Sequence, residues 1–121
     1  MKIFNHPISL NFIKHTYFSF KAKISLIRLT HNFFLKKTKL TGKIIDLGSG
    51  EGSNLTYYDF LDHNNANIEK ADYFKNAKNK INLEQNLSIG ENQYDTIILF
   101  NTIEHIENYK NLVSEIYRVL K

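Results

Sequence analysis

The chain has 121 residues, of which 42% are hydrophobic and 23% are charged, the composition of one ordinary globular domain with a modest core. It has no cysteine, which excludes disulfides and thiolate metal sites, and no run of about 18 apolar residues that could span a membrane. The net charge of +4 is unevenly divided. Residues 1–45 hold nine basic residues and no acid, whereas residues 46–121 hold seven basic and twelve acidic residues.

The first forty residues contain bulky apolar side chains at helical spacing. From Ile13 onward, apolar residues recur at intervals of three, four or seven, which predicts one or two helices within residues 8–38. We therefore expect a helical basic arm or cap over residues 1–42 and a second unit over residues 43–121.

A glycine-rich segment follows a short apolar run, which predicts a buried strand over residues 44–47. Glycines let a ligand approach the backbone, and N–H groups at the start of a following helix attract an anion. A dinucleotide loop needs its third glycine three residues after the second, where this chain has serine. The pattern is instead Asp46-x-Gly48-x-Gly50-x-Gly52. A glycine-rich turn that binds nothing is the alternative.

Beyond the loop, the pattern predicts alternating helices and strands. We expect a helix over residues 53–63, a turn over 63–67, a strand over 68–74, a short edge strand over 81–84, a strand over 94–100 and an amphipathic helix over 106–120. The apolar, β-branched run of the last strand indicates burial on both faces, as in a parallel sheet.

Asp72 lies near the end of the second predicted strand, twenty residues beyond Gly52. In nucleotide-binding α/β units an acid at about that distance holds the ribose hydroxyls, because a carboxylate can accept two hydrogen bonds from a vicinal diol. The alternative is an ordinary strand-end acid, and Asp59 and Asp62 are further candidates for the ribose site.

In their order and spacing these segments resemble class I S-adenosylmethionine-dependent methyltransferases of the methyltransferase-11-like group. Residues 46–52 resemble the glycine motif of that family, and residues 93–100 resemble its fourth strand. Residues 103–106 are similar to its "LEH[IV]" signature, and residues 115–121 to its "E-x-x-RVLK" helix end. The resemblance spans residues 43–121 and implies a Rossmann-like parallel sheet, of which about four strands are present.

The resemblance also implies S-adenosyl-L-methionine as cofactor and a set of residues that would bind it. Those residues are Asp46, Gly48, Ser49, Gly50, Gly52, Asp72, Asn82, Leu83 and Asn101. The glycine loop would face the methionine and ribose portions, with Asp46 orienting it, and Asp72 would take the ribose hydroxyls. Asn82 and Leu83 would lie near the adenine, although the family usually has an acid where this chain has Asn82. Asn101 would lie beneath the transferred methyl group.

The implied reaction is methyl transfer from S-adenosylmethionine to an unidentified acceptor by in-line displacement. A base is needed only if the acceptor must lose a proton. His105 is the first candidate for that base and Glu104 the second, while the alternative for His105 is a helix-start residue packed on the sheet. The other histidines share no spacing that suggests a metal site, so we expect none.

The family sheet has seven strands, so we expect this chain to be the amino-terminal part of a methyltransferase domain, with its fourth strand at an exposed edge. A truncated, non-catalytic remnant is the alternative function; it would bind the cofactor weakly or act only through a partner chain that completes the sheet.

The expected partners are a small-molecule, sugar or lipid acceptor. For the arm, three interpretations stay open: a cap over the nucleotide site, an amphipathic helix on an anionic membrane, and a nucleic-acid patch. We expect no specific nucleic acid, because no recognition motif accompanies the charge. The expected location is the cytoplasm. The basic arm adds the alternative of a peripheral location at the inner face of the membrane.

Overall fold

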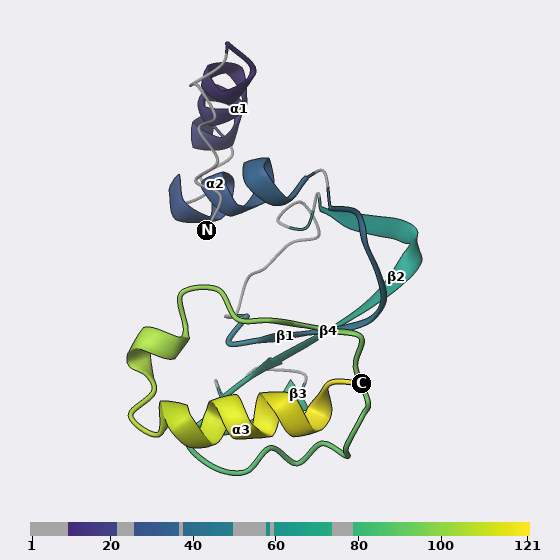
Figure 1. Ribbon diagram of the computed structural model, residues 1–121. Coiled ribbons are helices and arrows are strands. Elements are labelled where there is room, and N and C mark those ends of the chain that lie inside the picture. The colour runs from purple at the N-terminus through teal and green to yellow at the C-terminus, as the bar shows by residue number, and fades with distance from the viewer. Residues whose placement is uncertain (1–9, 22–25, 37, 50–57, 59, 74–78) are drawn as a thin grey trace, which may run out of the picture.

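The computed structural model describes residues 10–21, 26–36, 38–49, 58, 60–73 and 79–121 (Figure 1). The elements are α1 (Leu10–Lys21), α2 (Leu26–Leu35), β1 (Leu40–Leu47), β2 (Leu61–Asp72), β3 (Asn79–Lys80), β4 (Thr96–Ile98), a 3-10 helix η2 (Ile103–His105) and α3 (Tyr109–Val119). The strands form one parallel sheet in the order β3-β2-β1-β4. The predicted α/β class, with about four parallel strands after a helical arm, is confirmed.

Strand β1 lies between β2 and β4 and is buried on both faces. Its last four residues are at most 5% exposed, and Ile44 pairs with Ile68 on one side and with Thr96 on the other. Because successive side chains of a strand point to opposite faces, Ile45 and Leu47 share one core cluster while Ile44 belongs to another. The apolar run that predicted this strand therefore supplies both cores.

Helix α3 covers one face of the sheet (Figure 1). Its buried residues Leu112, Glu115 and Val119 lie at spacings of three and four, which places them on one side of the helix. Leu112 and Val119 pack in a cluster with residues of the central strands and of the segment before β4: Ile45, Leu47, Ala71, Ile81, Leu83, Leu87 and Tyr94. The apolar spacing thus predicted the helix correctly but its buried side only in part, since Leu112 is buried whereas Val113 and Tyr117 are 50% and 84% exposed.

The opposite face of the sheet carries an aromatic cluster. Tyr58, Phe60 and Leu61 are each at most 2% exposed and pack with Ile44 and Ile98. The last residue of α2, Leu35, also packs against this cluster. Helix α1 packs in turn against α2, where the Phe12 and Phe33 rings meet edge to face at 4.9 Å. The arm, predicted as one or two helices, therefore consists of two, and α2 is the helix that packs against the sheet.

The predictions for residues 53–67 are wrong where the structure describes them. Strand β2 begins at Leu61, so a helix cannot reach His63 and the turn predicted over 63–67 is strand instead. Leu61 is buried beside Leu40, and the regular ladder with β1 runs from Ala66 to Ala71. Between these two points the register with β1 shifts, and Asn64 N–H donates to Asp62 Oδ1 at 3.1 Å, so the asparagine-rich segment is an exposed, irregular part of the strand. The remainder of the predicted helix, residues 53–57 and 59, lies outside the described residues.

The third strand lies two residues earlier than predicted. It is Asn79–Lys80, and Ile81 N–H still donates to Asp72 O at 3.2 Å. The chain then turns, because Asn82 Oδ1 accepts the Glu84 N–H at 3.0 Å in an Asx turn. That turn prevents the strand predicted over 81–84. The fourth strand and the last helix lie within their predicted ranges but are shorter.

A partly buried ion pair, with side chains 29% exposed for Arg118 and 11% for Glu115, fastens the segment before β4 to α3. Arg118 donates to both carboxylate oxygens of Glu115, at 2.9 and 2.6 Å, and also to the carbonyls of Leu87 and Ile89. Glu115 accepts the Leu87 N–H at 2.8 Å. The hydrogen bonds from Arg118 hold the pKa of Glu115 below its usual range. Each side-chain nitrogen of Arg118 and each carboxylate oxygen of Glu115 is thus bonded, which offsets the cost of taking the two charges partly out of water.

Substitution of Leu112 by alanine tests the α3 face of the core. Leu112 is fully buried, so the variant should lose about 2–5 kcal/mol of unfolding free energy through lost apolar contact and a residual cavity. The neighbouring Val113 is 50% exposed, and Val113→Ala should stay within about 0.5 kcal/mol of the wild type. Urea titration followed by circular dichroism measures both. Equal effects of the two substitutions would contradict the packing described.

The Tyr94 hydroxyl gives the fold a pH dependence in alkaline solution. It donates to Glu69 Oε2 at 2.7 Å. Burial is the larger cause and this hydrogen bond the next, and together they raise the pKa of Tyr94 from 10.0 to about 12. The folded state therefore favours the neutral phenol. Its contribution to stability is complete below about pH 10 and is lost as the pH rises to about 12.

The unfolding free energy should consequently fall more steeply between pH 10 and 12 in the wild type than in Tyr94→Phe, which has no phenol to ionise. Tyr117 is 84% exposed, so Tyr117→Phe should follow the wild type. Urea titrations across this range give the comparison. If Tyr94→Phe declined as steeply as the wild type, the Tyr94–Glu69 contact would not carry the effect.

Candidate functional site

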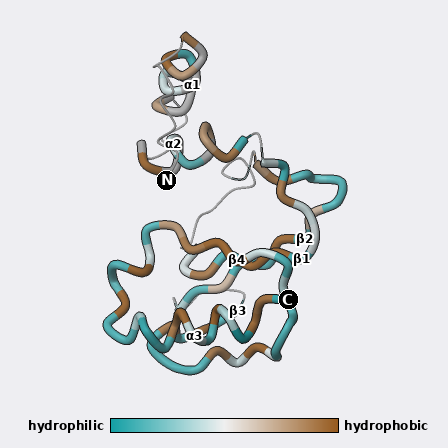
Figure 2. The backbone as a smooth tube through the Cα atoms, in the orientation of Figure 1, coloured by the Kyte–Doolittle hydropathy of each residue, from teal (hydrophilic) through white to brown (hydrophobic). Residues whose placement is uncertain are grey.

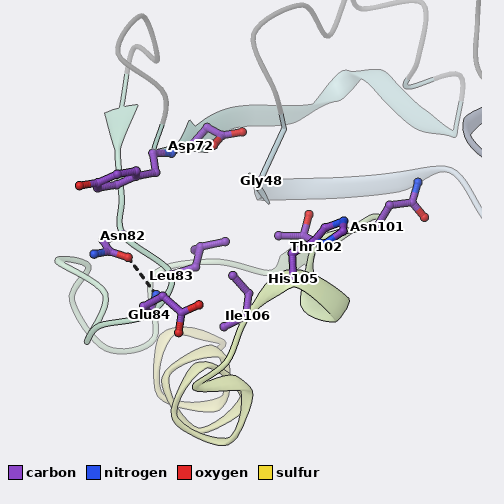
Figure 3. A pocket seen from close by; sticks show the side chains of 10 residues that line it. Gly48, Asp72, Asn82, Leu83, Glu84, Asn101, Thr102, His105 and Ile106 are labelled. Atoms are coloured by element: carbon purple, nitrogen blue, oxygen red, sulfur yellow. Dashed lines mark hydrogen bonds between the residues drawn. The ribbon is translucent and has the colours of Figure 1, made fainter.

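A cavity of 410 Å³ lies at the edge of the sheet where the parallel strands end (Figure 3). In open α/β sheets, this carboxyl edge is where ligands bind. The volume falls within the range of small-molecule pockets, roughly 300–1,000 Å³. The lining residues follow β1, β2, β3 and β4 in the chain and are Gly48, Asp72, Tyr73, Asn82, Leu83, Glu84, Asn101, Thr102, His105 and Ile106.

Gly48 is the first residue after β1, and only glycine fits its place. Its φ of +77° is unfavourable for residues with a Cβ, and its N–H donates to Ala71 O at 2.8 Å. A Cβ on Gly48 would lie 2.4 Å from Thr102 Oγ1 and 2.5 Å from Thr102 Cγ2. The residue after β1 and the segment after β4 therefore lie in direct contact where both line the cavity.

Thr102 fixes its own side of this contact. It is 9% exposed, and its hydroxyl donates to Phe100 O at 3.0 Å and lies 3.5 Å from Leu47 O. Thr102 is not among the residues predicted for the site, although its place beside Asn101 at the end of an apolar strand was a usable signal.

Asp72 ends β2 at the cavity. It is 9% exposed, and its Oδ1 accepts the Tyr73 N–H at 2.6 Å. A carboxylate can accept several hydrogen bonds at once, which is the capacity that a pair of ligand hydroxyls needs. Tyr73 also lines the cavity and is 70% exposed, although no motif in the sequence points to it.

The segment after β3 forms a second wall. Asn82 holds the turn to Glu84, as the dashed line in Figure 3 shows, and Leu83 is buried in the core. The two carboxylate oxygens of Glu84 accept the N–H groups of Glu107 and Asn108, each at 2.9 Å. Asn108 is the residue that precedes α3, so Glu84 fixes the start of that helix.

The residues after β4 form the third wall. Asn101 has a φ of +52°, a left-handed conformation that asparagine tolerates better than most residues. His105 is exposed in η2 and lines the cavity, while its backbone N–H donates to Thr102 O at 3.0 Å. Glu104, the second candidate base, is exposed and is not among the lining residues.

Asp46 and Ser49 flank the glycine turn and do not line the cavity. Asp46 is 5% exposed and accepts a hydrogen bond from the Tyr58 hydroxyl, which comes from the aromatic cluster. Ser49 is 4% exposed, with its N–H 3.5 Å from Ala71 O. Gly50 and Gly52 lie outside the described residues.

The structure thus brings six of the residues predicted for cofactor binding or catalysis to one cavity: Gly48, Asp72, Asn82, Leu83, Asn101 and His105. Among the described residues, no group of three or more histidines or acids could hold a metal ion. None of the described helices combines the length and apolar character needed to cross a membrane.

Substitution of Gly48 by alanine should destabilise the site. The left-handed backbone alone costs about 1–2 kcal/mol, and the clash with Thr102 adds to it. Gly90→Ala is the matched control, because its Cβ would meet Gln93 only at 3.5 Å, and it should change stability by less than about 0.5 kcal/mol. Urea titration of Gly48→Ala alone and with Thr102→Ala should show partial recovery in the double variant. No destabilisation by Gly48→Ala would refute the described close approach.

Comparison with known proteins agrees with the fold. The family model described as "Methyltransferase domain" matches residues 18–121, which extends into α1 and so beyond the motifs that begin at residue 43. No curated protein and no solved structure gives a significant match. The family match covers most of the chain and confirms the resemblance seen in the motifs. The chain therefore belongs to the methyltransferase domain family, and its general reaction is methyl transfer.

Proposed function

We propose that this chain transfers a methyl group from S-adenosyl-L-methionine to an acceptor, and that the cofactor occupies the cavity at the carboxyl edge of the sheet. The observation that carries the proposal is the placement of Gly48 and Asp72 on the same cavity, at the ends of two adjacent parallel strands. Gly48 offers an approachable backbone and Asp72 offers a carboxylate. An adenosine derivative needs both kinds of contact.

The residues present fit the parts of this cofactor. Asp72 lines the cavity at the end of β2, and a carboxylate is the group that accepts hydrogen bonds from the two ribose hydroxyls. Asn82 Oδ1 already accepts the Glu84 N–H, and its second lone pair suits the adenine amino group. Leu83 and Ile106 add apolar surface to the lining on that side (Figure 3).

The cofactor would supply a methyl group on a positively charged sulfur, which is a good leaving group. The protein then acts mainly by holding the acceptor in line with that methyl group, because orientation alone can lower such a barrier by several kcal/mol. Asn101 lines the wall after β4 and would be the residue to contact the reacting end of the cofactor. His105, from the same wall, takes the proton from an acceptor that must lose one. Glu104 is second for this role.

Calorimetric titration of the full chain with S-adenosylmethionine tests the cofactor proposal. Asp72→Asn should weaken binding roughly tenfold to a hundredfold, because hydrogen bonds to a charged group are worth about 1.5–3 kcal/mol. The amide oxygen of the variant can still accept the Tyr73 N–H, so the local backbone should be kept. Asp62→Asn is the matched control: Asp62 lies at the other end of β2 and bonds only to neighbouring residues among those described.

Saturable binding that Asp72→Asn weakens and Asp62→Asn leaves within about twofold would support the site. Absence of binding by a folded wild-type chain would refute it. Transfer of radiolabelled methyl groups into separate pools of small molecules, sugars and lipids then identifies the acceptor class. Binding without transfer to any pool would favour a non-catalytic role that depends on a partner.

A further inference from the structure

Helix α1 presents an apolar stripe to the solvent. Leu10, Ile13, Tyr17 and Phe20 are 77%, 55%, 60% and 76% exposed, and their spacings of three, four and three place them on one side of the helix. Single exposed apolar residues are ordinary on a protein surface. A contiguous stripe of four large ones marks an interaction surface instead.

The orientation of this stripe is fixed by the other side of α1. The Phe12 ring packs edge to face on Phe33 of α2, and Figure 1 shows α1 standing away from the sheet. Figure 2 shows hydrophobic residues along both arm helices, and α2 adds Ile27 and Phe34, which are 55% and 52% exposed. Packing between the two helices therefore leaves apolar side chains of both arm helices exposed.

Charge indicates what covers the stripe. Residues 1–45 hold nine basic residues and no acid, and Lys14 is exposed on α1 itself. Residues 46–121 carry a net charge of −5, from seven basic and twelve acidic residues, so an anionic surface attracts the arm and repels the rest. A second copy of the arm would be repelled by the same positive charge. Nucleic acid would satisfy the lysines but would leave Leu10 and Ile13 without an apolar partner.

We infer that α1 docks on an anionic phospholipid membrane, with the apolar stripe at the boundary between headgroups and acyl chains. An apolar face together with basic residues is the pattern of helices that lie in this interface. The 12 residues of α1 extend about 18 Å, well short of the roughly 30 Å hydrocarbon core, so the helix lies in the membrane surface. This inference concerns the arm and does not depend on the proposed cofactor site.

Co-sedimentation of the full chain with phospholipid vesicles tests the inference. The vesicles contain phosphatidylcholine alone or with about 30% phosphatidylglycerol, at low and at high NaCl. We expect binding only with phosphatidylglycerol, and weaker binding at high salt. Tyr17→Ser combined with Phe20→Ser should reduce the affinity roughly tenfold or more, because two buried apolar side chains are lost. Lys14→Gln should reduce it about fivefold.

Matched controls lie on α3, on the body of the protein. Tyr117 is 84% exposed and Lys110 is exposed, so Tyr117→Ser and Lys110→Gln remove the same kinds of group from another surface and should leave binding within about twofold. Circular dichroism establishes that each variant is folded. Failure of the folded wild type to bind the anionic vesicles, or equal losses in the α1 and α3 variants, would overturn the inference.

Two other occupants of the stripe are distinguished by the same proteins. Analytical ultracentrifugation without lipid would show a dimer that the Tyr17 and Phe20 substitutions abolish if a second copy covered the stripe. Titration with single-stranded RNA would show affinity without vesicle binding if the arm were a nucleic-acid surface. Either result would overturn the membrane inference.

Discussion

The parallel pairing of β1 with β2 and β4 is the constraint on which the rest of the structure depends. Parallel strands end at the same edge of the sheet, so the turns after β1, β2 and β4 must meet there. Gly48, Asp72 and Asn101 come from three distant places in the sequence and line one cavity for this reason. Burial of β1 on both faces fixes its position and therefore the position of this edge.

Two contacts then determine the shape of the cavity. Thr102 approaches Gly48 so closely that no Cβ fits between them, which holds the first and fourth strand ends together. On the other side, Glu84 uses both carboxylate oxygens to hold the backbone before α3. Glu84 therefore forms part of the wall and also holds the start of the helix behind it. In the proposed cofactor site, Asn82 would be the side chain for the adenine amino group, since Glu84 already holds the backbone and Leu83 is apolar.

The sequence predicted the parts of the fold whose patterns are local. The apolar run of β1 spans a few residues and the helical period of α3 a few turns, so each pattern can be read from neighbouring residues alone. The strand and the helix that they predict are both present. The amino-terminal half of β2 could not be predicted in this way, because its asparagines favour a turn and its two ends, Leu61 and Ala66, are set by pairing with Leu40 and Gly42 of β1, far away in the sequence. The site shows the same division. Glycines and strand-end acids can be recognised from their spacing in the sequence. The roles of Thr102 and Glu84, and the contact of Tyr58 with Asp46, depend on residues that are close only in the folded structure.

The arm and the cavity are joined through one stacked pair of rings. His31 of α2 lies on Phe100 with ring centroids 4.4 Å apart and planes at 23°, and Phe100 directly precedes Asn101 and Thr102 in the cavity wall. This contact therefore links α2, against which α1 packs, to the residues that line the cavity after β4. A lipid is the class of acceptor for which the docking surface and the transfer site would act together. With a sugar or a soluble small molecule as acceptor, membrane docking would fix where the protein works without contributing to recognition.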